Sequence, residues 1–196
     1  SDAQKSHADV LDLGKYVLAL RWSALDADNQ TVLAGLQTNQ AKSVDALFAA
    51  LSHYHSPMQN VVAADDQGNI RFKAAGRAPV RDPANDIRGV APSPGWDARY
   101  DWKGWLPYEQ TPQDDGVSGG AGVQGARGWI ATANQRVTAP GYPHFLTQDW
   151  ALPYRYERIA QLIEATPKHD AASMQAIHRD VTSLATRRLL PHLQQA

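Results

Sequence analysis

Residues 57–81 read PMQNVVAADDQGNIRFKAAGRAPVR and contain two short apolar runs on either side of the polar stretch Asp-Asp-Gln-Gly-Asn. Apolar runs of this length around a glycine-containing turn are typical of a β-hairpin. The sequence therefore predicts strands near 60–65 and 69–75, joined by a turn at Asp66-Gln67-Gly68.

Packing alone does not explain two residues of this hairpin. Asn60 places a polar amide at the start of the first strand. After the second strand the chain passes Gly76 and Pro79 to a lone arginine, Arg81. A hairpin that only packs needs neither side chain, so both are candidate functional residues.

The overall composition excludes several classes of function. The 196 residues carry a formal net charge of −1, which gives no electrostatic reason to expect nucleic acid or an anionic membrane surface as a partner. The absence of cysteine excludes disulfides, thiolate metal sites and a cysteine nucleophile. No apolar run approaches the roughly 18 residues of a membrane span. The polar start SDAQKSHADV lacks the features of a signal peptide.

The first half of the chain predicts a mixture of strand and helix. Residues 15–22, KYVLALRW, favour a strand, and Ser43 can cap a helix. Apolar residues recur at helical spacing after this cap, namely Val44, Leu47, Phe48 and Leu51. Residues 79–112 predict an ordered loop, because Trp96, Trp102 and Trp105 carry too much apolar surface to leave in water.

The second half begins with a glycine-rich stretch, 114–128, that we expect to be mobile. A strand is predicted over 129–133, and a helix from near Thr147 that tolerates Pro153 in its first turns or kinks there. Asp170 can cap a last long helix. That helix would bury Met174, Ile177, Val181 and Leu184. The element order predicts the α+β class rather than regular βαβ units.

Several motifs have a simpler explanation than a functional site. Gly120–Gly125 matches GxGxxG, but no strand precedes it and a predicted strand follows, so we interpret it as a loop. His53 and His55 could bind a metal from one side of a strand, yet no third ligand lies at suitable spacing, which favours an ordinary histidine pair. His178 lies beside the apolar stripe of the last helix and is interpreted as a packing or surface residue.

Carboxylate and hydroxyl patterns are equally unspecific. No GxSxG nucleophile elbow occurs, although a Ser-His-Asp triad stays open on composition alone. The pairs Asp65-Asp66 and Asp114-Asp115 lie at predicted turns, where aspartate is favoured for local hydrogen bonding. The tryptophan cluster could stack on a sugar, but a satellite core is commoner.

A set of motifs resembles the penicillin acylase family, which includes penicillin G acylases, cephalosporin acylases and acyl-homoserine lactone acylases. The motifs occur in the family's order from "ALRWSALD" to "LLP" and cover essentially the whole chain. They are "QNVVAADDQGNI", "GRAPVR", "GWDARYDWKGWLPYEQTP", "GWIATANQ", "YP" at 142–143, "YRYERIAQLI" and "MQAIHRDVTSLATRRLLP".

The resemblance implies a segment of an N-terminal nucleophile hydrolase, an αββα sandwich in which a precursor cuts itself and exposes a catalytic serine. The α-amino group of that serine acts as the base, which is chemically reasonable because it titrates near pH 8. By matching, Asn60 would donate its side-chain amide to the oxyanion, and Arg81 would orient that amide and supply positive charge.

The chain departs from the family pattern in three places. Its first residues, Ser1-Asp2-Ala3-Gln4, match a region downstream of the family's nucleophile, so Ser1 is not expected to be catalytic. The stretch 116–128 is longer than usual, and Gln135 replaces the second Asn of a common Ala-Asn-Asn. The family's calcium is held mainly by other segments, so no cofactor is expected here. Asp65 is the nearest candidate ligand, and a turn role fits it better.

We therefore expect residues 1–196 to form one middle segment of a large subunit, with strand and helix over 15–53, the hairpin over 57–81, a loop over 82–128, and strand and helices over 129–196. The parent would hydrolyse a small-molecule acyl amide and be periplasmic or secreted. The rest of the parent acylase would be the segment's partner, and the isolated segment would be inactive and prone to self-association. The alternatives are an acyl-homoserine lactone acylase and a non-enzymatic binding module that uses the Trp96–Trp105 loop.

Overall fold

The hairpin predicted from the sequence is the centre of the structure, a computed structural model that describes residues 12, 14–114 and 128–195. Strands β1 (Gln59–Ala64) and β2 (Ile70–Ala75) pair antiparallel, with Asn60 opposite Ala74. Gly68 in the turn has a φ of 85°, a conformation that glycine adopts without steric cost. The predicted strand positions are therefore confirmed to within a residue.

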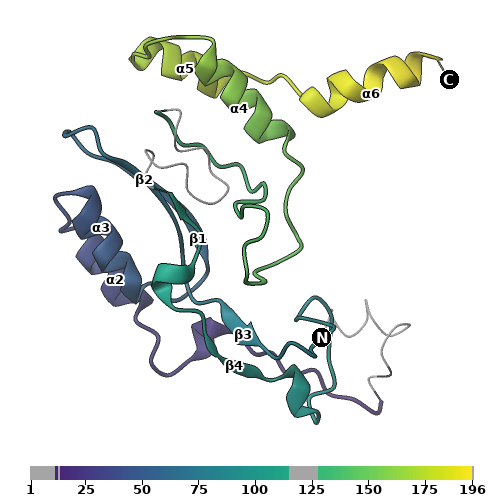
Figure 1. Ribbon diagram of the computed structural model, residues 1–196. Coiled ribbons are helices and arrows are strands. Elements are labelled where there is room, and N and C mark those ends of the chain that lie inside the picture. The colour runs from purple at the N-terminus through teal and green to yellow at the C-terminus, as the bar shows by residue number, and fades with distance from the viewer. Residues whose placement is uncertain (1–11, 13, 115–127, 196) are drawn as a thin grey trace.

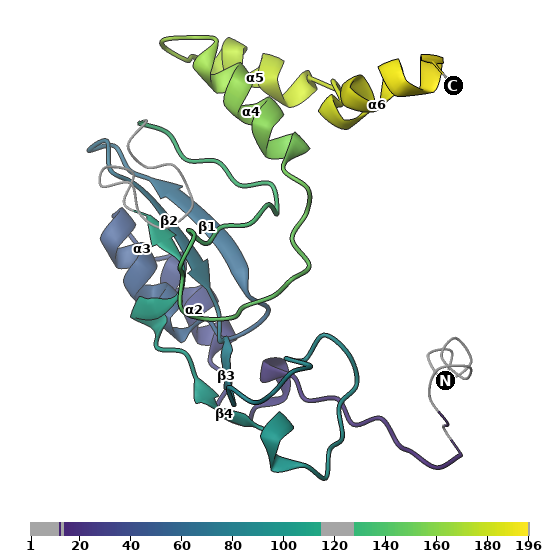
Figure 2. The ribbon, with the colours of Figure 1, turned by 45° about the vertical axis from the view of Figure 1, so that its right-hand side comes forward.

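The alternation of side chains along the hairpin creates two different faces. On one face Ala75 packs with the buried residues Val44, Phe48 and Leu51 of the first helices. On the other face Phe72 and Ala74 pack with Val137, while Met58, Ile130 and Trp150 lie against them. Figures 1 and 2 show α2 and α3 on one side of the hairpin and the segment that leads to α4 on the other.

The helices that cover the first face are α2 (Thr31–Thr38) and α3 (Val44–Ala50), which continues into a 3-10 helix, Leu51–His53. The Ser43 side chain accepts a hydrogen bond from the Ala46 backbone N–H, which confirms the predicted cap. Helix α2 was not predicted from the sequence. Its one buried residue is the small Ala34, so the helix has no pronounced apolar stripe.

The sheet gains a third strand that was not predicted, β5 (Gln113–Asp114), which pairs with β2. Lys73 of β2, which pairs with Gln113 of this strand, is buried. Its ammonium group donates hydrogen bonds to the carbonyl oxygen of Tyr108 and to Oε1 of Gln113, and it lies 4.3 Å from the Tyr108 ring centroid. Lys73 thus fastens the third strand to the hairpin.

Residues 79–112 are more regular than the predicted loop. Strands β3 (Pro79–Arg81) and β4 (Trp102–Trp105) form a second antiparallel sheet, and 3-10 helices occur at Ala98–Tyr100 and Tyr108–Gln110. A further 3-10 helix, Ser23–Leu25, lies outside this stretch. Trp102 and Trp105 meet edge to face with centroids 5.0 Å apart. Trp96 contradicts the expected burial of the tryptophans, because it stays 76% exposed and only stacks on Tyr16.

Two predicted strands are absent from the described part of the chain. Residues 15–22 and 129–133 belong to no sheet. Their apolar residues resemble strands locally, but a strand also needs a neighbour that accepts and donates its backbone hydrogen bonds. Residues 129–133 lie instead across the second face of the hairpin, where Ile130 packs against the core.

The C-terminal region forms three helices: α4 (Tyr154–Glu164), α5 (Ala171–Arg179) and α6 (Leu184–Gln195). Helix α4 begins later than predicted, directly after Pro153. Asp170 caps α5 as predicted and forms a capping box with Ser173. The single long helix was wrong, because Asp180 ends α5 and binds Arg158 of α4 through both carboxylate oxygens.

The apolar stripe assigned to that helix is buried only in part. Leu184 is buried, whereas Met174 is 41% exposed and Val181, in the break between the helices, is 96% exposed. Figure 1 shows α6 extending away from the rest of the structure, so most of its surface has no neighbour among the described residues.

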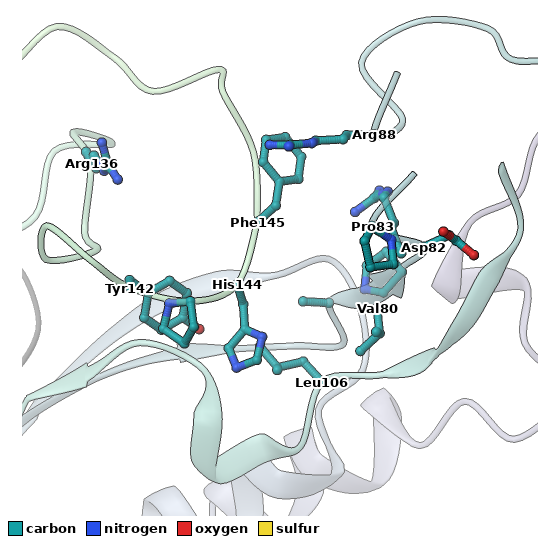
Figure 3. A pocket seen from close by; sticks show the side chains of 13 residues that line it. Val80, Asp82, Pro83, Arg88, Leu106, Arg136, Tyr142, His144 and Phe145 are labelled. Atoms are coloured by element: carbon teal, nitrogen blue, oxygen red, sulfur yellow. The ribbon is translucent and has the colours of Figure 1, made fainter. Parts of the chain in front are cut away.

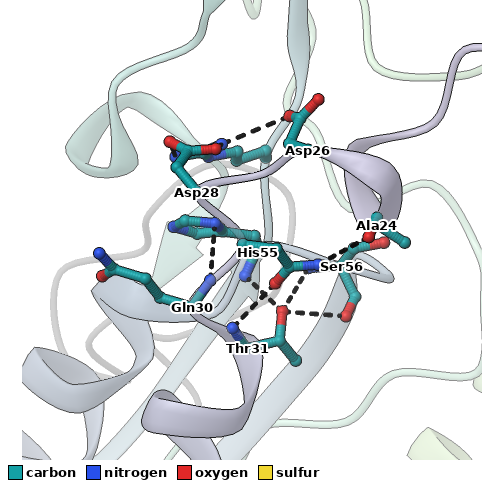
Figure 4. A network of polar contacts seen from close by, with 9 residues as sticks. Ala24, Asp26, Asp28, Gln30, Thr31, His55 and Ser56 are labelled. Carbon is teal, nitrogen blue, oxygen red and sulfur yellow. Dashed lines mark hydrogen bonds and ion pairs between the residues drawn. The ribbon is translucent and has the colours of Figure 1, made fainter.

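A polar network joins the segment before α2 to the base of the hairpin (Figure 4). The Thr31 hydroxyl accepts hydrogen bonds from the backbone N–H groups of His55 and Ser56. Arg77, just after β2, binds both carboxylate oxygens of Asp28 at 2.8 and 2.7 Å. These contacts hold the N-terminal segment against the base of the hairpin, close to the strand that carries Asn60.

Candidate active site

Asn60 lies near the start of β1 on the second face of the hairpin, beside Ala74 and opposite the side covered by α2 and α3. The residue is half-buried, and its amide nitrogen donates a hydrogen bond to Oγ1 of Thr132 at 3.1 Å. The amide is therefore held by a hydroxyl from the segment that crosses this face.

A pocket of about 650 Å³ opens beside this amide. Its apolar wall comes from the core of the second face and from α4. That wall consists of Met58, Ala74, Val137, Leu146, Trp150 and Ile159. Its polar lining includes Asn60, Thr132, Asn134 and Arg155. An apolar cavity with a few converging polar groups is typical of a site for a small organic ligand.

The turn at 132–135 belongs to no sheet, so no strand of the described residues bonds its backbone. Side chains hold it instead. Asn134 has a φ of 64°, and the Gln135 side chain accepts a hydrogen bond from the Ala133 N–H at 2.7 Å. Arg155 of α4 donates to the Ala133 carbonyl at 2.6 Å and to the Asn134 side chain at 2.8 Å. Gln135, which departs from the family pattern, is thus a buried residue that supports the turn.

Arg81, the second predicted site residue, ends β3 and lines another pocket, of about 460 Å³. Its guanidinium packs against Gly89, where an added Cβ would lie 2.8 Å from Nη2. Nη1 is buried and has no hydrogen-bond partner among the described residues. Burial lowers the pKa of Arg81, but a guanidinium stays protonated at neutral pH.

The ring of Phe145 lies close to two guanidinium groups in this second pocket, and Figure 3 shows the Arg88 side chain beside the ring. The Arg81 Cζ is 5.8 Å and the Arg88 Cζ 5.3 Å from its centroid, distances at which a cation is attracted to the face of an aromatic ring. His144 and Tyr142 complete the nearby lining.

The structure does not bring Asn60 and Arg81 into contact. They line different pockets, and within the described ranges the hydrogen-bond partner of the Asn60 amide is Thr132 rather than Arg81. The two pockets share one wall, since residues 134–147 contribute to both. The sequence reading missed Thr132 and Arg155. Thr132 lies within the quoted motif "GWIATANQ", but only the fold reveals which neighbour it faces.

Among the other candidates, His53 and His55 have structural roles. The His53 ring contacts the Gln30 side chain, and the His55 ring accepts the Gln30 backbone N–H. His178 is exposed in the last turn of α5. Asp114 is buried in β5, and Gly120–Gly125 lies outside the described residues.

Asp65 has the turn role expected from the sequence. Its carboxylate accepts hydrogen bonds from the backbone N–H groups of Gln67 and Asn69 and from the Asn69 side chain, which closes the hairpin turn. Among residues 12, 14–114 and 128–195, no three metal-binding side chains lie close enough together to hold an ion.

Comparison with known proteins identifies the family. The model of the penicillin amidase family matches residues 4–196. The acyl-homoserine lactone acylase QuiP of Pseudomonas aeruginosa is 37% identical over 179 residues, which make up 89% of this chain and 19% of that protein. The chain belongs to the penicillin amidase family. The penicillin acylase 2 proenzyme of Pseudomonas sp. strain SE83 is a further member, 35% identical over 143 residues, which are 73% of this chain and 17% of the proenzyme.

The fold agrees with this membership. The thermostable penicillin G acylase from Alcaligenes faecalis matches with a TM-score of 0.68 at 20% identity, over 89% of this chain and 30% of that chain. The resemblance to this family and the α+β fold class are thereby confirmed. The chain spans only about a fifth of the length of QuiP, of which it covers 19%. Within the described ranges, no helix has the length and apolarity that crossing a bilayer requires.

Proposed function

We propose that the parent protein is an amidohydrolase that cleaves an acyl-amide bond through an N-terminal serine, and that this segment supplies Asn60 as an oxyanion donor. The observation that carries the proposal is the half-buried Asn60 amide, which lines a pocket with one apolar wall and is already held at its nitrogen by Thr132. Family membership supplies the reaction class.

In the proposed reaction, the serine hydroxyl adds to the amide carbonyl while its proton passes to the serine's own α-amino group. The carbonyl oxygen becomes an oxyanion, which accepts a hydrogen bond from Asn60. Collapse expels the amine, which takes up the proton, and water then hydrolyses the acyl-enzyme ester. We assign the nucleophile to a serine outside this chain rather than to Ser1.

Arg81 would act through its charge rather than by direct contact with Asn60. Its Nη1 is buried without a hydrogen-bond partner among the described residues, and Arg81 lines a different pocket from Asn60. A buried guanidinium raises the local potential and so favours a developing negative charge nearby.

The proposal is tested by Asn60→Ala in the full-length protein. Loss of one oxyanion donor lowers kcat by about 10²- to 10³-fold. Hydrolysis of a chromogenic phenylacetyl amide measures this loss. The matched control is Asn39→Ala, the same substitution at an exposed position after α2 that lines neither pocket. Wild-type turnover by Asn60→Ala would contradict the oxyanion role of Asn60. No turnover of any amide by the full-length wild-type protein would instead favour a non-enzymatic binding module, with exposed Trp96 in its contact surface.

A second candidate is an acyl-homoserine lactone acylase, which the similarity to QuiP and the apolar wall around Trp150 favour. The full-length enzyme would then hydrolyse long-chain acyl-homoserine lactones in preference to phenylacetyl amides. A ratio of kcat/KM values for the two substrates decides between the candidates.

The rest of the parent chain is the segment's proposed partner, and this part alone is expected to be inactive because it lacks the nucleophile. Turnover of either substrate by the purified 196-residue chain would contradict that expectation. Periplasmic or extracellular localisation is also proposed from family membership, and fractionation of cells that express the full-length gene tests it.

A further inference from the structure

We propose that Thr132 is a positioning residue, which fixes the plane of the Asn60 amide so that one of its N–H groups points at the reacting carbonyl. The inference rests on the proposed function of Asn60. The amide nitrogen carries two hydrogens, and the hydrogen bond to Thr132 Oγ1 uses one of them. The second hydrogen is thereby left for the oxyanion.

An asparagine amide needs such a restraint. The terminal torsion of asparagine has a broad energy profile, so an unrestrained amide samples many orientations. An oxyanion donor is effective only when it is aimed before the charge develops. One hydrogen bond at 3.1 Å fixes the direction of the nitrogen and therefore of its second N–H group.

The Thr132 hydroxyl can impose this direction because its own backbone is held in place. The next residue, Ala133, is buried, and both of its backbone polar groups are bonded to side chains. The Gln135 side chain accepts from its N–H, and Arg155 donates to its carbonyl oxygen. The restraint therefore runs from α4 through the turn to the amide on β1.

A double-mutant cycle in the full-length enzyme tests the inference, with Thr132→Val, Asn60→Ala and the combined variant. We expect Thr132→Val to lower kcat about tenfold with KM changed less than about twofold, because one hydrogen bond that orients the donor is lost. In the Asn60→Ala background the same change should alter kcat by less than about twofold, since no amide is left to orient. Single-turnover assays measure the slow variants.

Thr132→Ser is the matched control, because it keeps the hydroxyl and should retain kcat within about threefold of the wild type. If Thr132→Val does not fold, Thr132→Ala replaces it in the cycle. Equal losses in the two backgrounds, or a Thr132→Ser variant as impaired as Thr132→Val, would overturn the inference. Full activity of Asn60→Ala would instead refute the function proposed for Asn60, so the two failures are distinguishable.

Discussion

At the scale of single residues, Lys73 is the least expected side chain of the core. Its side chain is buried between the hairpin and the third strand, and burial lowers its pKa from 10.5 to about 8, while the charge of Glu109 opposes the shift. The folded protein therefore releases this proton at lower pH than the unfolded chain does.

This shift predicts how stability depends on pH. Between about pH 8 and 10.5 the unfolded state binds more protons at Lys73, so this residue's contribution to the free energy of unfolding rises with pH. Lys73→Met in the full-length protein should lack the rise. Urea unfolding at pH 8 and at pH 10 measures the free energy of unfolding of wild type and variant. The difference between the two proteins at each pH cancels the titration of the groups that both contain. Identical pH dependence in both would contradict the lowered pKa.

The candidate site residues illustrate what a single sequence can supply. Asn60 stood out because a polar amide at a strand start has no packing role, and the fold places it at a pocket. Its partner Thr132 is 72 positions away in the chain, so no local pattern links the two. The family resemblance matched Arg81, but the direct contact it implied with Asn60 is absent, because β3 directs Arg81 into the other pocket.

At the scale of elements, the features that depend on nearest neighbours in sequence were predictable. The β1–β2 turn and the caps at Ser43 and Asp170 are set by residues within four positions of one another. Strand β5, by contrast, is two residues long and exists only because β2 pairs with it. The break between α5 and α6 likewise depends on a distant partner, Arg158.

The Ser43 cap gives a prediction for helix α3. Ser43→Ala removes the acceptor for the Ala46 N–H and should destabilise the helix by about 1 kcal/mol. Amides of α3 in the full-length protein should then exchange with solvent about fivefold faster. Ser43→Asn retains a capping side chain and should exchange as the wild type does. Unchanged exchange in Ser43→Ala would show that packing on the hairpin alone holds α3.

At the scale of the whole molecule, much apolar surface stays exposed. Val32 and Leu36 of α2 are 80% and 62% exposed, and Leu193 of α6 is 62% exposed. In addition, no described strand pairs with the outer edge of β1. Exposed strand edges and apolar patches are surfaces on which other chains assemble.

The purified 196-residue chain is therefore expected to self-associate. Light scattering coupled to size exclusion should give a mass that rises with concentration above 21.4 kDa. Val62→Lys adds a charge to edge strand β1, where the native side chain is 45% exposed, and should shift the distribution towards the monomer. A monomeric wild-type chain at all concentrations would contradict this expectation.

The shared wall of the two pockets has a consequence for how this family member can change over time. Phe145 lines the pocket of Arg81, and its neighbour Leu146 lines the pocket of Asn60. A substitution that enlarges one cavity shifts the backbone that shapes the other. Mutations at positions 145 and 146 should consequently be epistatic. The substitutions that selection can accept in one pocket then depend on which residue lines the other pocket at the neighbouring position.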